Sequence, residues 1–163
     1  MESTPHSKLQ VWALVIMRVA IGWHCLYEGL AKLINPGWSA AGFLSQSKWI
    51  FAPVFNWMAD TPAVLNIVDQ MNIWGLILIG LGLILGVFAR VASGAGVLLL
   101  LLYYLSNPPL PGLFYSLPQE GSYLIINKIF VEMTALFVLT VIPTSHIIGL
   151  DRLIFWKKRS GQV

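Results

Sequence analysis

Four long apolar runs constrain the fold of this chain more strongly than any other feature of its sequence. They occupy residues 9–33, 62–86, 90–105 and 122–142. A helix that crosses the hydrocarbon core of a membrane needs about 20 mostly apolar residues. Of the 163 residues, 57% are hydrophobic and 10% are charged, whereas about 25% of the residues of an ordinary soluble domain are charged. The sequence therefore predicts a single all-α domain, an integral membrane four-helix bundle within the lipid bilayer.

Breaker residues and glycines predict how the runs are connected. The first run stops at residues 35–37 (Asn-Pro-Gly) and the third at 107–109 (Asn-Pro-Pro), and both are strong breakers. Only residues 86–90 separate the second run from the third, so these two should form a tight hairpin. Gly82 and Gly86 form a Gly-x-x-x-Gly pair, which favours close helix packing. The pair fits packing within the hairpin, and it also leaves a homo-oligomer interface open.

Residues 37–60, between the first two runs, are rich in aromatic side chains. Tryptophan prefers the headgroup level of a membrane because its ring is apolar while its N–H needs a partner. The segment therefore predicts one or two short helices that lie at the interface or cap the bundle. An ordinary amphipathic loop packed on the bundle fits the same residues. Its aromatic members are Trp38, Phe43, Trp49, Phe51, Phe55 and Trp57.

The positions of the basic residues predict the orientation of the chain. Lys8 precedes the first run, Arg90 lies in the hairpin turn, and four basic residues follow the last run, whereas residues 106–121 contain none. Cytoplasmic loops carry an excess of Lys and Arg. We expect a multi-pass protein of the cell (inner) membrane with both termini in the cytoplasm. The two longer connections should face the outside.

The first run contains four titratable residues, Arg18, His24, Glu28 and Lys32. Each ionised group at the centre of a bilayer costs about 2.5–3.5 kcal/mol on insertion scales, so such groups normally face a protein interior or a cavity. At about 100° per residue, the four occupy a sector of about 120° on the helix. We expect this face to point into the protein.

The fourth run offers partners for these groups. Glu28 and Lys128 should each lie about 9 Å below the outer boundary, and His24 and Glu132 about 15 Å below it, at a rise of 1.5 Å per residue. The sequence thus predicts two level pairs, Glu28 with Lys128 and His24 with Glu132. Asn127 lies beside them.

We interpret these residues as a polar cavity between the first and fourth spans that opens toward the outer leaflet. Asn107, at the outer end of the third span, would line its mouth. A buried ion-pair network that fixes helix register and binds nothing fits the same residues.

The sequence contains no pattern for a resident redox cofactor. His24 is the one histidine well inside a run, so a haem with two histidine ligands from this chain is not expected, and neither is a flavin, because no Gly-rich strand–helix turn is present. The single cysteine, Cys25, and the absence of a two-histidine and carboxylate set argue against a metal. The net charge of +3 forms no basic patch with interleaved aromatics, so no nucleic acid partner is expected.

A quinone remains a reasonable ligand for the polar cavity. Its carbonyls accept hydrogen bonds from His, Lys or Arg, and its reduction takes up protons that His or Glu can relay. A lipid-like substrate or a transported solute would use similar groups. Four aromatic residues could form a slot for the ring, although packing or an interfacial belt is the more common role of such residues: Trp23, Tyr27, Tyr103 and Tyr104.

Several short motifs, spread in order over nearly the whole chain, resemble the DoxX/DoxD family. They are Arg18, 28–33 (Glu-Gly-Leu-Ala-Lys-Leu), 42–43 (Gly-Phe), 86–90 (Gly-Val-Phe-Ala-Arg), Asn127-Lys128 with Glu132, and 149–152 (Gly-Leu-Asp-Arg). The resemblance implies a four-helix membrane protein. It also implies a link to quinone-dependent oxidoreductases, because DoxD-type proteins serve as a subunit of thiosulfate:quinone oxidoreductase. Other relatives look like membrane partners or assembly chaperones of redox enzymes.

These observations lead to one preferred hypothesis and two rivals. In the preferred one, the chain is a membrane subunit that passes electrons from a partner dehydrogenase on the outer face to quinone. His24 and Glu132 would relay protons, Lys32 and Lys128 would orient the quinone head, and Arg18 would anchor the network. Glu28, Asn107 and Asn127 complete the expected binding set. The first rival is a membrane anchor or assembly factor without a redox role. The second is a small-solute transporter. Its support is weaker, because many transporter sites need a helix that is broken at its midpoint and no run here is.

Overall fold

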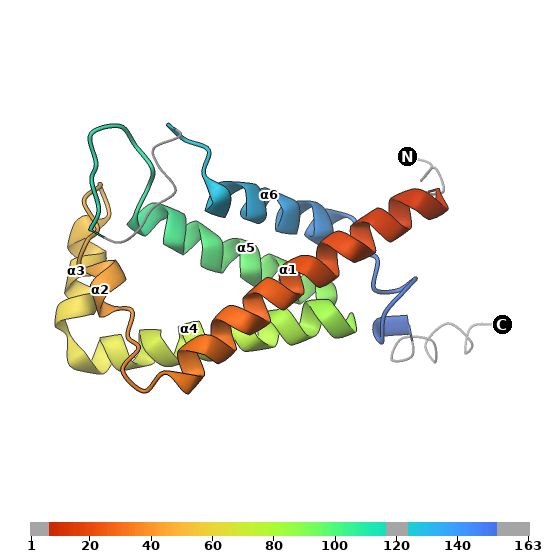
Figure 1. The fold of residues 1–163 in the computed structure, drawn as a ribbon, viewed down its shortest axis with the longest axis horizontal. Coiled ribbons are helices and arrows are strands. Elements are labelled where there is room, and N and C mark those ends of the chain that lie inside the picture. Colours follow the sequence, from red (N-terminus) through yellow and green to blue (C-terminus); the bar gives the residue numbers. More distant parts are fainter. Residues whose placement is uncertain (1–6, 117–123, 153–163) are drawn as a thin grey trace.

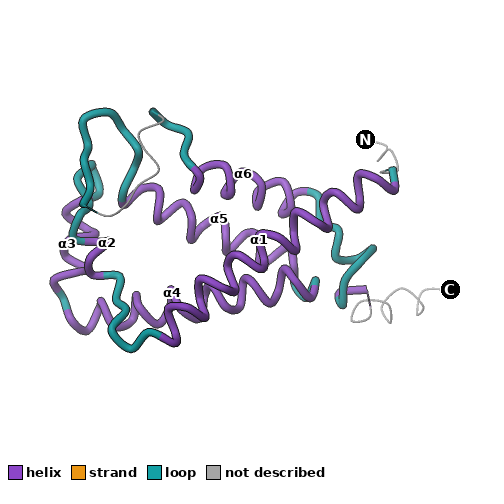
Figure 2. Tube along the Cα trace, viewed as in Figure 1, coloured by secondary structure: helices purple, strands orange, loops and turns teal. Residues whose placement is uncertain are grey.

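The structure is a computed structural model that describes residues 7–116 and 124–152. Its described part consists of helices and loops, without strands (Figure 2). The helices are α1 (Lys8–Ile34), α2 (Ala41–Leu44), α3 (Ala52–Asp60), α4 (Pro62–Leu85), α5 (Ala89–Ser106) and α6 (Lys128–Val141). The predicted all-α class is confirmed.

Helices α4, α5 and α6 run roughly along the long axis of the molecule, and α1 crosses them obliquely (Figure 1). The most extensive packing is between α1 and α4, followed by α5 with α6, and α1 also touches α6. The short helices α2 and α3 lie with residues 107–116 at one end of the bundle, which we call the cap end. The first turns of α1, the α4–α5 turn and residues 144–152 lie at the opposite end, the clasp end.

Three helices, α1, α4 and α5, are long and apolar enough to cross a membrane. Many of their large apolar side chains are exposed on the outside of the bundle, including Trp12 and Trp23 on α1 and Met71, Trp74 and Leu78 on α4. In water such a surface would be unfavourable, whereas hydrocarbon solvates it well. These features indicate a membrane protein.

The fourth predicted span is shorter than expected. Helix α6 has 14 residues, or about 21 Å at 1.5 Å per residue, and it begins at Lys128 instead of residue 122. Two features place its start. Leu124 has a positive φ of 64°, which a helix does not allow, and Asn127 is the N-cap, since its side chain accepts a hydrogen bond from Phe130 N at 2.9 Å.

Glycines set the close packing of α1 on α4. A Cβ added at Gly80 would lie 2.6 Å from Leu26 N and 2.7 Å from Gly22 O. A Cβ at Gly29 would lie 2.9 Å from Ile77 N. Backbone atoms therefore touch where these helices meet, as small residues allow in membrane bundles. The sequence interpretation considered glycines of the second and third runs only and missed the contribution of α1.

The predicted tight hairpin between α4 and α5 is also present. A Cβ at Gly82 would lie 2.9 Å from Ala92 Cβ, across the hairpin. Gly86 ends α4 in the left-handed region, with φ 67°, a conformation that favours glycine. Gly82 thus packs inside the hairpin, whereas Gly86 forms its turn and lies against Gly149 and Arg18. A homo-oligomer interface stays a prediction.

Candidate functional site

The four titratable residues of α1 lie in three different environments. The buried seam of this helix consists of Val11, Val15, Arg18, Gly22, Cys25 and Gly29, so Arg18 alone of the four is fully inside. Lys32 is half-buried at the edge of the seam. His24 lies further round the helix and is half-buried because it contacts Glu132 of α6. Glu28 lies about a quarter turn from the seam, and its side chain is 48% exposed. The expectation that the whole polar face points inward is therefore wrong for Glu28.

His24 contacts Glu132 across the α1–α6 boundary. The imidazole Nδ1 lies 2.8 Å from the carboxylate Oε1, so the contact predicted from depth along the two helices is confirmed. Glu132 is the more buried partner, with 13% of its side chain exposed against 40% for His24. One member of the pair is thus held inside the bundle, while the other reaches its surface.

Lys32 belongs to a second polar cluster, between α1, α4 and α5. Its ammonium donates to Asn72 Oδ1 at 3.1 Å, and Asn72 Nδ2 donates to the Tyr103 hydroxyl at 2.5 Å. The ammonium also lies 5.0 Å from the ring centre of Trp38 and 5.6 Å from that of Tyr103. Glu28 Oε2 is 3.9 Å from it. Cation–π contacts and a carboxylate stabilise a charge in such a place.

Along α1, Glu28 lies between the two clusters. His24, Glu28 and Lys32 are successive i, i+4 neighbours on α1, and such residues lie above one another on one helix face. The ion pair that the structure gives Glu28 is the one with Lys32. Its predicted pairing with Lys128, at the start of α6, stays a prediction.

Arg18 is bound at the clasp end, which the sequence did not predict. Its guanidinium donates to Thr144 Oγ1 at 3.2 Å and to the carbonyl of Ile148 at 2.7 Å. In the same region Asp151 accepts from Phe88 N at 2.8 Å and from Ala89 N at 3.4 Å, at the start of α5. We call these contacts the clasp, because they fasten the segment after α6 to α1 and to the α4–α5 turn.

Asn107 lies in the cap. It is buried, and its Nδ2 donates to the carbonyl of Phe43 at 3.1 Å. The neighbouring carbonyl of Ser106 accepts from Ser47 Oγ at 2.7 Å. These bonds tie α2 to the end of α5, so Asn107 fixes the cap in place. Its expected position at the mouth of a cavity between the first and fourth spans stays a prediction.

The cap also fastens the loop after α5. Lys48 Nζ donates to the carbonyl of Phe114 at 2.6 Å, and the Tyr115 hydroxyl donates to the carbonyl of Pro108 at 3.0 Å. Partial burial raises the pKa of Tyr115 above its ordinary value. This hydroxyl therefore stays a neutral donor at physiological pH. The aromatic-rich segment is helical in part and caps the bundle, as one of the sequence interpretations held.

The four aromatics considered for a ring-binding slot do not form one group. Trp23 and Tyr27 are exposed on α1, beside His24 and Glu28 in the sequence. Tyr103 lies with Lys32, as described above. Tyr104 donates to the carbonyl of Ile125 at 2.7 Å, which holds the segment before α6.

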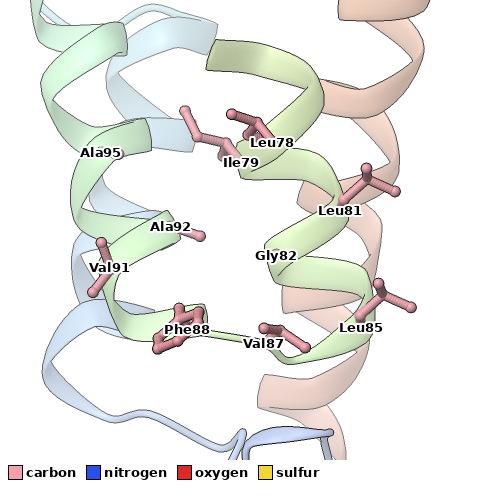
Figure 3. Close-up of a pocket in the computed structure, with 10 residues that line it drawn as sticks. All are labelled: Leu78, Ile79, Leu81, Gly82, Leu85, Val87, Phe88, Val91, Ala92 and Ala95. Carbon is pink, nitrogen blue, oxygen red and sulfur yellow. The ribbon is translucent and has the colours of Figure 1, made fainter. Parts of the chain in front are cut away.

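A groove between α4 and α5 near the clasp end has a volume of about 410 Å³ (Figure 3). None of the predicted site residues lines it. Its lining is apolar and consists of Leu78, Ile79, Leu81, Gly82, Leu85, Val87, Phe88, Val91, Ala92 and Ala95. Such a surface suits hydrocarbon and supplies no side-chain donor for a ligand carbonyl.

Three residues of these clusters were missed by the sequence interpretation. Asn72 lies inside an apolar run. Its position alone could have predicted a polar contact, because a polar side chain in hydrocarbon needs a partner. Asp151 was quoted only as part of a motif. Thr144 gave no signal, because a threonine after Pro143 is ordinary in a loop.

Within residues 7–116 and 124–152, no three His, Cys, Asp or Glu side chains are grouped so that they could hold a metal ion. A scan against protein-family models, a search of curated proteins and a search of solved structures each found no match to the chain.

Proposed function

We propose that this chain is the quinone-reactive membrane subunit of an oxidoreductase complex in the cell (inner) membrane. A partner dehydrogenase on the outer face would supply electrons. The resemblance to the DoxX/DoxD family points the same way. The contact between His24 and Glu132 is the observation that carries the proposal.

This pair has the properties of a proton relay to a membrane-soluble ligand. An imidazole can both accept and donate a proton, and a carboxylate beside it can accept one. Glu132 is held inside, whereas 40% of the His24 side chain is exposed, at a level where the neighbouring surface of α1 is apolar. Trp23 and Tyr27 flank this position and are 63% and 62% exposed. A quinone ring approaching from the lipid could stack on them and place a carbonyl at His24.

Distances along α1 divide the roles of the polar residues. His24 and Lys32 are eight residues apart, or about 12 Å along the helix axis, too far for one carbonyl oxygen to contact both. Lys32 is also engaged by Asn72 and faces the rings of Trp38 and Tyr103. We therefore propose that the quinone carbonyl binds at His24. Lys32 would instead stabilise the negative charge of Glu28. Arg18 serves the clasp and Asn127 caps α6, so neither is needed as a ligand.

The proposal is tested by purifying the chain from its native membrane in mild detergent. Mass spectrometry of the extracted lipids should find quinone, and the same preparation should contain a dehydrogenase subunit. Reduction of decylubiquinone or a menaquinone analogue by this complex should fall by at least about 10²-fold in Glu132→Gln or His24→Phe, the size of a lost general acid–base step.

Thr134→Val is the matched control, since Thr134 lies on the same helix and bonds only to the carbonyl of Val131 in its own turn. It should reduce quinone at the normal rate. Unchanged turnover in both site variants, with normal membrane insertion, would remove the proton-relay assignment.

A second candidate, a membrane anchor or assembly factor, is favoured by a different observation. The two terminal nitrogens of Arg18 and the polar groups of the Lys32 cluster find partners within the protein, as a largely architectural network requires, although Arg18 Nε has none in the described part of the chain. This function predicts a partner that co-purifies without quinone. It also predicts that Glu132→Gln lowers the amount of bound partner and leaves the turnover of each assembled complex unchanged.

A further inference from the structure

We infer that water and protons reach the His24–Glu132 pair from the cap end of the bundle, along Glu28, and that the clasp end is closed to them. What the inlet means for quinone reduction rests on the proposed function. The inlet itself is argued from the placement of charges and apolar side chains alone.

Glu28 is an exposed carboxylate within an apolar helix. Its side chain is 48% exposed, although it lies within a helix long and apolar enough to cross a membrane. An ionised carboxylate in contact with hydrocarbon is strongly unfavourable, so an exposed one needs water. The cap end of α1 is six residues away, at Ile34, or about 9 Å along the axis. Water from that end therefore has the shorter path to this carboxylate.

Lys32 marks the way from the cap end to Glu28. Its ammonium is 3.9 Å from Glu28 Oε2, and it continues by hydrogen bonds to Asn72 and Tyr103. One helical turn beyond Glu28 is His24, in contact with Glu132 at 2.8 Å. Polar side chains thus follow one another from the cap end to the pair.

The side of the pair toward the clasp end has the opposite character. Leu83 of α4 and Leu136 and Leu139 of α6 are 0%, 0% and 2% exposed and belong to one core cluster. In α6, no residue after Glu132 is titratable. Arg18 is the next charged residue of α1 in that direction, and it is held in the clasp by Thr144 and Ile148. A dry apolar layer therefore separates the pair from the clasp end.

The inlet has a consequence for the reaction. Reduction of a quinone to its quinol takes two electrons from the partner dehydrogenase and two protons, which form the two new O–H bonds. With the donor and the inlet both on the cap side, electrons and protons enter from the same side. Turnover would then move no net charge across the membrane.

The inlet can be tested in sealed proteoliposomes with a charged, membrane-impermeant thiol reagent. Cys25 is buried, so the unmodified chain gives the baseline. Lys48→Cys marks the cap side and Arg90→Cys the clasp side, because both residues are exposed at these ends. The test positions are Glu28→Cys and His24→Cys. Trp23→Cys is the matched control, since it is adjacent to His24, more exposed, and on the apolar surface.

Reagent on the side that labels Lys48→Cys should label Glu28→Cys and His24→Cys at least about tenfold faster than Trp23→Cys, because hydrocarbon excludes an ionised reagent. Reagent on the other side should label neither. Labelling from the clasp side, no labelling from the cap side, or equal labelling of Trp23→Cys would each overturn the inference. Labelling needs no quinone, so its result tests the inlet alone. The proposed function is tested separately, by whether quinone is found in the purified protein.

Discussion

Arg18 is the most deeply buried charged residue in the part of the chain that the structure describes, with 3% of the residue exposed. Its two partners, the hydroxyl of Thr144 and the carbonyl of Ile148, are neutral. Asp151 lies in the same region and is itself bonded to the start of α5. A charge surrounded in this way joins chain segments, and it offers no exposed surface to a ligand.

We predict that Arg18→Leu destabilises the fold by about 3 kcal/mol or more, since it removes two hydrogen bonds to a charged group and each contributes about 1.5–3 kcal/mol. Thr144→Val removes one of the two bonds and should cost about 1.5–3 kcal/mol. The measurement is unfolding in detergent, followed by circular dichroism.

A double-mutant cycle tests the contact itself. The two substitutions should be less than additive, because each removes the same bond. Full additivity would contradict the role of Thr144. Quinone content per folded molecule should stay unchanged in Thr144→Val, which separates the clasp from the site.

The residues also show what a sequence can predict about buried charge. The His24–Glu132 contact followed from counting residues along two straight helices from a common boundary, because the rise per residue is fixed. It survived an error of six residues in the start of α6, since both residues lie inside regular helix. The partners of Arg18 could not be found in this way. They lie in the irregular segment after α6, and no periodicity places such a segment in space.

At the scale of elements, the α1–α4 contact depends on glycine backbone. We predict that Gly80→Ala destabilises the bundle by about 1–3 kcal/mol or more, the cost of overpacking. The added Cβ would meet Leu26 N at 2.6 Å and Gly22 O at 2.7 Å, and neither backbone atom can move without separating the helices.

Gly75→Ala is the matched control on the same helix. A Cβ there meets nothing within 4 Å, and alanine is the better helix former by about 1 kcal/mol. The control should therefore be neutral or slightly stabilising in the same detergent unfolding measurement. Equal losses from the two substitutions would show that the α1–α4 contact is looser than the structure has it.

The start of α6 gives a second prediction for an element. Asn127→Ala should cost about 0.5–2 kcal/mol, because it removes the N-cap. Asn127→Ser keeps a cap for Phe130 N but replaces the amide, so it should leave both stability and quinone reduction near normal. A loss of quinone reduction in the serine variant, at unchanged stability, would instead support the ligand role that the sequence suggested for this residue.

Element boundaries show the limit of hydropathy. The runs that became α1, α4 and α5 were placed within a few residues, because breakers such as Gly86 and residues 107–109 end them. The fourth predicted run, residues 122–142, has no Gly or Pro breaker directly before Lys128, where α6 begins. Leu124, Ile125 and Ile126 read as span by composition, yet Leu124 adopts φ 64° and Tyr104 bonds the carbonyl of Ile125. Tertiary contacts, which hydropathy does not contain, override the helix there.

At the scale of the whole molecule, connectivity argues for a fourth traverse of the bundle. Ser116 N is bonded to Gln46 at the cap end, whereas Leu150 N and Asp151 N are bonded to the carbonyls of Leu85 and Gly86 at the clasp end. The chain must therefore return from one end to the other between residues 116 and 150. Helix α6, at about 21 Å, supplies most of this distance, and the residues on either side of it supply the rest.

We therefore predict four membrane crossings, with both ends of the chain on one side. Reporter fusions at the two termini, one fluorescent only in the cytoplasm and one enzymatically active only outside it, should both report the cytoplasm, in agreement with the basic residues near the termini. Three crossings would place the termini on opposite sides. That result would mean that α6 lies within one leaflet, and it would also separate Arg18 from the segment that the clasp binds. Arg18→Leu would then leave stability unchanged, so the two measurements check each other.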